Sequence, residues 1–218
     1  MSIHPTAIVS GSAQLGHGVE LGPYSVIEDN VILGDGCKIG PNVQICEHTV
    51  VGNNCEIHHG SVVGGIPQDK KFKGEVTRTI IGDNNVIREY VTINRGTTGG
   101  GEETLIGKGN LIMCYVHIAH DCIIGDNTII SAYAGLAGHI QIDNGAVISP
   151  MVGIHHFCRI GELAYVGGMS KVTQDVPPFI MADGNPCRFR GLNLVGLRRN
   201  QLTPGAIAAL KETYRILF

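Results

Sequence analysis

Aliphatic residues recur at every sixth position along most of the chain, and this period is the strongest constraint on its fold. Twenty-six of them stay in register within three runs, without an exception inside a run. The runs extend from Ile3 to Val63, from Ile81 to Ile93 and from Ile106 to Val172. A period of six fits neither an α-helix nor the simple alternation of a strand. It fits a short strand followed by a turn, with the aliphatic side chain pointing inward.

Small residues and glycines complete the hexad. The position two places before the aliphatic is usually small, and four of the seven cysteines occupy it: Cys37, Cys55, Cys122 and Cys158. We interpret these four as core residues. Glycine often follows the aliphatic, where the turn needs an unusual backbone. Three strands close a triangular coil of about 18 residues, and successive coils pair about 4.8 Å apart. We therefore predict an all-β fold, a parallel β-helix of hexapeptide repeats.

Interruptions of the repeat define the rest of the organisation. We predict a β-helix domain over 1–185, with loops at 64–79 and 94–104, and a C-terminal helical segment over 186–218. In the first loop Asp69 and Glu75 replace aliphatic residues, so we expect one coil to bulge outward and expose Asp69 and the neighbouring lysines. The second loop breaks the phase, and it is either a mobile surface loop or the rim of an active site. Pro177 and Pro178 should end strand pairing.

The C-terminal helix is expected from Thr203 onward. This stretch has a helix start signal and apolar residues at helical spacing, namely Ile207, Leu210, Tyr214 and Leu217. A single helix of this length needs packing partners. The helical segment is therefore either truncated or short by nature.

Composition excludes several classes of function. The net charge is −3 and no long basic run occurs, which argues against nucleic-acid binding through bulk charge. We see no signal peptide and no apolar stretch long enough to span a bilayer. Seven cysteines without a CxxC motif indicate reduced thiols. We expect a cytoplasmic protein.

Five histidines cluster in the third run: His117, His120, His139, His155 and His156. Residues 18 apart stack along the prism, so His120 and Gly138 share one column and Asp121 and His139 the next. A histidine, an adjacent carboxylate and a free backbone amide are what acyl transfer to a hydroxyl requires. They act as base, as support for the base and as oxyanion donor. We predict His120, Asp121 and Gly138 as the catalytic residues.

The histidine cluster has three other interpretations. Surface histidines are usually just solvated, but five in stacked coils argue against that. Zinc held by histidines across subunits is chemically reasonable, yet the spacing differs from that of the hexapeptide-repeat carbonic anhydrases. A histidine–cysteine pair through Cys114 or Cys122 is weak because Cys122 occupies a core position. We expect neither a metal nor a cofactor.

At HIAHDC, residues 117–122, the sequence resembles the UDP-N-acetylglucosamine O-acyltransferases, which begin lipid A synthesis. The resemblance covers most of the chain, and its other motifs are IPQDKKFKGEVTR (66–78), REYVTINRGT (88–97), LAGH (136–139), HHFCRIG (155–161), QDVPPF (174–179) and GNPCRFRGLNLVGLRR (184–199). Three residues depart from the family pattern. His156 stands where glutamine is usual, Val195 where an acidic residue is common, and Asn200 where a basic one is common.

The resemblance implies a left-handed prism and a homotrimer with active sites between prisms. It also implies transfer of a 3-hydroxyacyl group from acyl carrier protein to the 3-hydroxyl of UDP-N-acetylglucosamine. By motif, His120 is the general base, Asp121 its support and the Gly138 amide the oxyanion donor. The residues implied in substrate binding are Asp69 and Lys71, the histidines 117, 139, 155 and 156, Gly168 as the limit on acyl length, and Asn193 and Arg199 for the nucleotide.

The sequence also allows other functions. One is a coenzyme-A-dependent sugar O- or N-acetyltransferase, and another is N-acylation of a 3-amino nucleotide sugar. A third is a non-catalytic β-helical scaffold. Acyl carrier protein is acidic, so a set of cationic residues offers either a docking surface for it or ordinary solvated charge. These residues are Lys70, Lys71, Lys73, Arg188, Arg190, Arg198 and Arg199.

Overall fold

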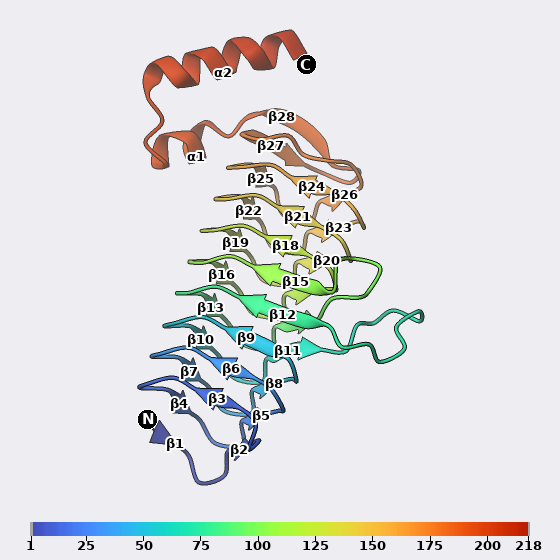
Figure 1. Cartoon of the computed structure of the whole chain (residues 1–218). Coiled ribbons are helices and arrows are strands. Elements are labelled where there is room, and N and C mark those ends of the chain that lie inside the picture. The colour runs from blue at the N-terminus through green and yellow to red at the C-terminus, as the bar shows by residue number, and fades with distance from the viewer. Residues whose placement is uncertain (1, 218) are drawn as a thin grey trace.

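The computed structural model describes residues 2–217, which form a triangular prism of short parallel strands followed by two helices (Figure 1). Sheet A, the first wall of the prism, contains β1 (Ser2–Ile3), β4 (Glu20–Leu21), β7 (Lys38–Ile39), β10 (Glu56–Ile57), β13 (Val86–Ile87), β16 (Leu111–Ile112), β19 (Ile129–Ile130), β22 (Val147–Ile148), β25 (Tyr165–Val166), β27 (Ile180–Asp183) and β28 (Arg188–Leu192). Sheet B contains β2 (Ile8–Val9), β5 (Val26–Ile27), β8 (Gln44–Ile45), β11 (Val62–Gly65), β14 (Thr92–Asn94), β17 (His117–Ile118), β20 (Gly135–Leu136), β23 (Gly153–Ile154) and β26 (Lys171–Val172). Sheet C contains β3 (Gln14–Leu15), β6 (Ile32–Leu33), β9 (Thr49–Val51), β12 (Arg78–Ile81), β15 (Glu103–Ile106), β18 (Ile123–Ile124), β21 (Gln141–Ile142) and β24 (Arg159–Ile160).

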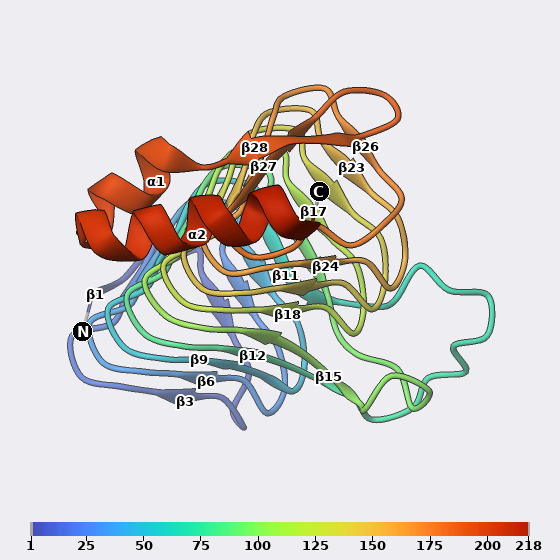
Figure 2. The same cartoon turned by 90° about the horizontal axis from the view of Figure 1, so that it is seen from above.

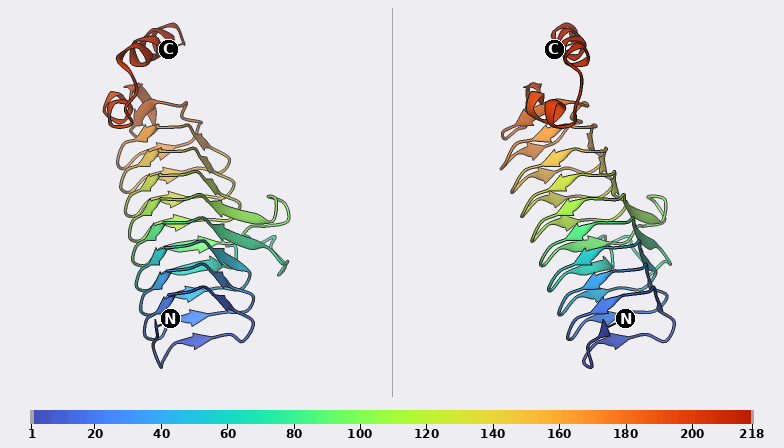
Figure 3. Two further views of the ribbon diagram at one scale, coloured as in Figure 1. Left: turned by 60° about the vertical axis from the view of Figure 1, so that its left-hand side comes forward. Right: turned by 90° about the vertical axis from the view of Figure 1, so that its left-hand side faces the viewer.

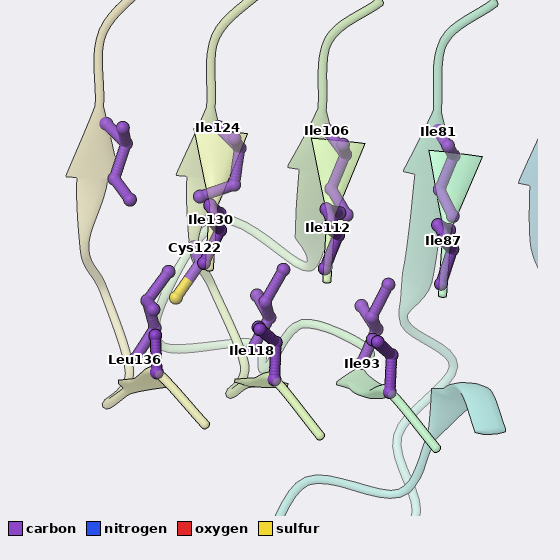
Figure 4. Packing of buried hydrophobic residues seen from close by; sticks show 14 of the residues in the cluster. Ile81, Ile87, Ile93, Ile106, Ile112, Ile118, Cys122, Ile124, Ile130 and Leu136 are labelled. Atoms are coloured by element: carbon purple, nitrogen blue, oxygen red, sulfur yellow. The ribbon is translucent and has the colours of Figure 1, made fainter. Parts of the chain in front are cut away.

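The predicted aliphatic residues form the core of the prism. Each pairs with its equivalent in the next coil, as Ile93 does with Ile118 and Ile118 with Leu136, so that the side chains stack in columns (Figure 4). Of the 26 predicted aliphatics, all but the three in the first coil are buried. The first coil has no coil below it to complete its packing. The four cysteines assigned to the core are buried as well, which confirms that part of the prediction.

Both interruptions leave the prism at the same edge, the corner where sheet B passes to sheet C. Residues 66–77 join β11 directly to β12, and residues 95–102 join β14 to β15 one coil later (Figures 1 and 2). The expectation of a bulging coil over 64–79 is therefore wrong. The coil itself is complete, because β11 and β12 are two of its consecutive sides, and the added residues form an insertion at their corner.

The winding continues beyond Val172, the last residue of the third aliphatic run. Val176 forms a parallel bridge with Ile160, and β27 pairs in parallel with β25 in sheet A. The two prolines lie in the corner between these contacts, where their missing N–H groups are not needed for pairing. The expectation that they end strand pairing is therefore wrong.

The end of the prism is capped by a hairpin and two helices (Figure 3). β28 pairs antiparallel with β27, so the segment from residue 186 begins with a strand, and helices follow only as α1 (Leu194–Arg199) and α2 (Pro204–Leu217). As predicted, Thr203 begins the second helix, since its hydroxyl accepts the N–H of Ala206 at 3.2 Å. Ile207 is buried in a small cluster with Leu163 and Leu197. Neither helix of the described chain is long and apolar enough to cross a membrane.

Candidate active site

His120 and Asp121 lie at the corner between β17 and β18, the same edge from which both insertions leave. Nδ1 of His120 is 2.6 Å from Oδ2 of Asp121. The side chain of Asp121 is fully buried and that of His120 is 10% exposed. The carboxylate accepts a hydrogen bond from the N–H at Nδ1. Nε2 of His120 is therefore left without a proton and is the basic nitrogen. The pair has the geometry of a supported general base.

Thr97 of the second insertion and Thr104 of β15 both form hydrogen bonds with Asp121. The backbone N–H and the hydroxyl of Thr97 each donate to one carboxylate oxygen at 2.7 Å. The hydroxyl of Thr104 accepts the Asp121 N–H at 2.9 Å. The sequence did not identify Thr97 or Thr104 as site residues. The signals for them were the break in phase at 94–104, for which the active-site rim was one of two open interpretations, and, for Thr97, its place at the end of the motif REYVTINRGT.

Gly138 lies directly against the ring of His120. A Cβ atom at this position would be 2.6 Å from Cε1 and 2.9 Å from Nε2 of the imidazole, so only glycine leaves room for the ring. Gly138 is buried, so its amide is less open than we predicted. Within residues 2–217 this N–H has no hydrogen-bond acceptor. A buried amide without a partner is rare in proteins, and here it is a donor that a substrate oxygen can use.

His139 occupies the next position along the corner. Its ring stands perpendicular to that of His120, with centroids 5.1 Å apart, and stacks on Phe157 at 4.6 Å. Its Nε2 is 3.7 Å from Oδ2 of Asp121. Burial is the main cause that lowers the pKa of His139, and the charges of Asp121 and Asp69 oppose the shift. We expect a neutral imidazole at neutral pH.

The remaining histidines line the same corner. His117 lies on β17, its Nδ1 2.8 Å from the hydroxyl of Thr92, and burial followed by the charge of His120 lowers its pKa. His155 and His156 lie one coil beyond Gly138 and are exposed, with their rings perpendicular at 5.5 Å. The structure thus brings all five predicted histidines to one edge of the prism.

The first insertion approaches this edge as well. Asp69 is half-buried, and its carboxylate accepts the backbone N–H of Lys71 at 3.0 Å. Burial lowers the pKa of His139, and the charge of Asp69 opposes that larger effect. Lys71 is exposed, as are Lys70 and Lys73. No hydrogen bond or ion pair joins Lys71 to the histidines within the described chain.

Three predicted substrate residues lie elsewhere on the prism. Gly168 is exposed at the corner between sheets A and B. Asn193 and Arg199 line a cavity of about 580 Å³ against the outer face of sheet A. The Asn193 side chain accepts the N–H of Gly196 at the start of α1 and donates to the carbonyl of Leu163, so it is already engaged. One chain does not bring these residues to His120.

The site also contains a possible donor set for a cation. His120, Asp121 and His139 place one ligand atom each within 4.8 Å of one another. Both oxygens of Asp121, however, already accept hydrogen bonds from Thr97, and Oδ2 also faces His120. A metal would have to displace these donors. The absence of a metal from the mechanism therefore stays a prediction.

Family models match two parts of the chain. The model described as bacterial transferase hexapeptide (six repeats) matches residues 30–65 and 103–138. The model described as UDP N-acetylglucosamine O-acyltransferase, domain 2, matches residues 175–218. The chain is thus similar to these families in its repeat and in its C-terminal part.

Curated relatives and solved structures agree with the family models. An acyl-[acyl-carrier-protein]–UDP-N-acetylglucosamine O-acyltransferase from Paracidovorax citrulli is 59% identical over 217 residues, which are 100% of this chain and 83% of the relative. The enzyme of the same name from a Sulfurovum species is 54% identical, with the same coverage. The crystal structure of a UDP-N-acetylglucosamine O-acyltransferase from Moraxella catarrhalis is 42% identical and superposes with a TM-score of 0.99, covering 100% of this chain and 85% of that one. A superposition this close requires the same hand of winding, and the prism is left-handed as predicted.

Proposed function

Because the chain belongs to the UDP-N-acetylglucosamine O-acyltransferase family, we propose that His120 and Asp121 form the catalytic pair that transfers a 3-hydroxyacyl group to the 3-hydroxyl of the sugar. The protein is an acyltransferase that uses acyl carrier protein as donor and UDP-N-acetylglucosamine as acceptor. The single observation that carries our assignment of the site is the 2.6 Å contact between His120 Nδ1 and Asp121, which leaves Nε2 as the base.

The proposed mechanism follows from these positions. Nε2 of His120 removes the proton of the sugar hydroxyl as its oxygen attacks the thioester carbonyl. Asp121 stabilises the imidazolium that forms, because its carboxylate accepts a hydrogen bond from the N–H at Nδ1. The N–H of Gly138 donates to the oxyanion of the tetrahedral intermediate. Collapse of the intermediate breaks the carbon–sulfur bond, and the imidazolium returns its proton to the departing thiolate of the carrier.

The acyl donor and acceptor can be tested with purified protein. We expect product from 3-hydroxyacyl carrier protein and UDP-N-acetylglucosamine, and mass analysis of a reaction with mixed acyl chains will give the preferred length. Exposed Gly168 has no side chain, and we propose that this leaves room for a longer acyl chain. Turnover with acetyl-coenzyme A alone would contradict the proposal and favour a sugar acetyltransferase. An amide product from a 3-amino sugar would revise only the acceptor.

We propose that the active enzyme is a trimer with sites between prisms. Arg199 lies at the outer face of sheet A, whereas His120 lies at the corner between sheets B and C. A second copy that places its Arg199 beside this corner would complete the site. The exposed lysines 70, 71 and 73 would lie on its rim, where an acidic carrier protein can dock. All seven cysteines are unpaired, which supports a location in the reducing cytoplasm.

Mixed trimers test this arrangement. His120→Ala and Arg199→Ala proteins are each expected to have little activity, and they are unfolded and refolded together at equal amounts. If each site takes His120 from one subunit and Arg199 from the next, about a quarter of the sites regain both residues. The recovered rate should therefore approach a quarter of the wild-type rate. Refolding without recovery, with mixed trimers confirmed by mass, would place both residues in a site of one chain.

A further inference from the structure

Thr97, in the loop of residues 95–102, is hydrogen-bonded to the Asp121 carboxylate. Both oxygens of Asp121 accept a hydrogen bond from Thr97, Oδ1 from the backbone N–H and Oδ2 from the hydroxyl, each at 2.7 Å. Oδ2 is also the oxygen that faces Nδ1 of His120. Two donors from one residue fix the plane of the carboxylate, and that plane sets the direction of the bond to His120.

Thr97 itself is held by its own loop. Its carbonyl accepts the N–H groups of Gly100 at 3.0 Å and Glu102 at 2.9 Å, which closes a tight turn. The base of the loop is tied to β12, because Arg78 donates its N–H to Glu102 and accepts the N–H of Gly96. The strands at both ends of the loop, β14 and β15, pair with β17 and β18, the two strands that flank His120 and Asp121. The loop therefore has a fixed position against the catalytic pair.

Gly100 covers the carboxylate from outside. A Cβ atom on Gly100 would be 2.0 Å from Cγ and 2.3 and 2.4 Å from the two oxygens of Asp121. The backbone of the loop thus lies directly on the carboxylate, whose side chain is fully buried. The loop therefore excludes water from the Asp121 carboxylate, and this buried charge must receive its hydrogen bonds from protein groups. Gly99, one residue earlier, has space, since its Cβ would meet only the Thr97 hydroxyl at 4.0 Å.

We propose that Thr97 is a positioning residue for the acyl transfer and that Gly100 seals the carboxylate it positions. Thr97 acts through Asp121, which orients the imidazole of His120, and neither loop residue touches the reacting atoms. The inference rests on the proposed function, since it needs His120 as the base. It gives the second insertion a role in the chemistry that the hexad pattern does not show.

The hydroxyl is tested with two variants of nearly equal size. Thr97→Val keeps the backbone donor and removes the hydroxyl. We expect kcat to fall about 10- to 100-fold, because the lost hydrogen bond is one to a charged group. KM should stay within about twofold, because substrate contacts are unchanged. Thr97→Ser keeps both donors and should stay within about threefold of wild type. Equal losses in the Val and Ser variants would overturn the role of the hydroxyl.

A double-mutant cycle separates positioning from a purely structural effect. In the Asp121→Ala background, measured with a radiolabelled donor so that residual rates are visible, Thr97→Val should change kcat by less than about twofold. The full loss in that background would show that Thr97 does not act through Asp121. In parallel, Gly100→Ala should lower kcat by at least as much as Thr97→Val, whereas Gly99→Ala in the same loop should be close to wild type. Equal rates for the two glycine variants would overturn the seal.

The outcome is distinguishable from failure of the proposed function. If His120→Ala turns over at the wild-type rate, the proposed mechanism fails and the loop has no base to position. If His120→Ala is inactive but Thr97→Val has wild-type kcat, the mechanism stands and only the positioning role is lost.

Discussion

Replacing His120 with alanine should lower kcat by about three to four orders of magnitude, since general-base catalysis contributes up to about 10⁴-fold. The alanine keeps the backbone of the corner and removes the imidazole whose Nε2 accepts the hydroxyl proton in the proposed mechanism. Asp121 keeps both donors from Thr97, so the corner should stay folded. KM for the nucleotide sugar should change little, because the imidazole acts on the transition state. Steady-state rates over a range of both substrates measure the effect.

Two controls make this result specific. His17→Ala removes an exposed histidine that is distant from His120 in the sequence, and kcat should stay within about twofold of wild type. The thermal midpoint and the oligomeric state of the His120 variant should match those of wild type, which excludes loss of fold as the cause. Wild-type turnover by a folded His120→Ala protein would remove His120 as the general base, and the acyl transfer would then need another group in that role.

The architecture could be predicted from the sequence because every coil carries the same pattern of residues. Each inward aliphatic is paired with an equivalent residue in the next coil, as Ile118 is with Leu136, so one period determines both the strand and its register. The same register places His120, Gly138 and Asp121 together, and the proposed catalytic pair and its close glycine are found side by side. The hand of the winding does not follow from the period. It came from the resemblance to a family.

Features that depend on non-repeating contacts could not be predicted in this way. The hexad count shows that 64–79 and 94–104 are irregular, but it does not show that both leave from one corner, because that depends on which sides of the coil they join. Thr97 is hydrogen-bonded to a residue 24 positions away through a loop with no period. Pairing also continues past Pro177 and Pro178, because these prolines lie in a corner, where a residue's strand propensity has no effect.

Replacing Gly138 with alanine should lower kcat by about 100- to 1,000-fold, because displacement of a catalytic group by about 1 Å has effects of this size. The added Cβ would lie 2.6 Å from Cε1 and 2.9 Å from Nε2 of His120, so the ring must turn away and lose its alignment with Asp121 or with the substrate. The substitution keeps the Gly138 amide, so it measures the space that the imidazole needs and not the oxyanion donor.

Gly11 provides the matched control for this change. It occupies the same place after its aliphatic residue, at the same corner of the first coil, and a Cβ there would meet nothing within 4 Å. Gly11→Ala should therefore keep kcat within about twofold of wild type. KM for the nucleotide sugar should change little in either variant, since a Cβ on Gly138 meets the ring of His120 and a Cβ on Gly11 meets nothing. If Gly138→Ala and Gly11→Ala had the same kcat, the ring of His120 would not depend on this glycine, and the close packing of the two could not be part of catalysis.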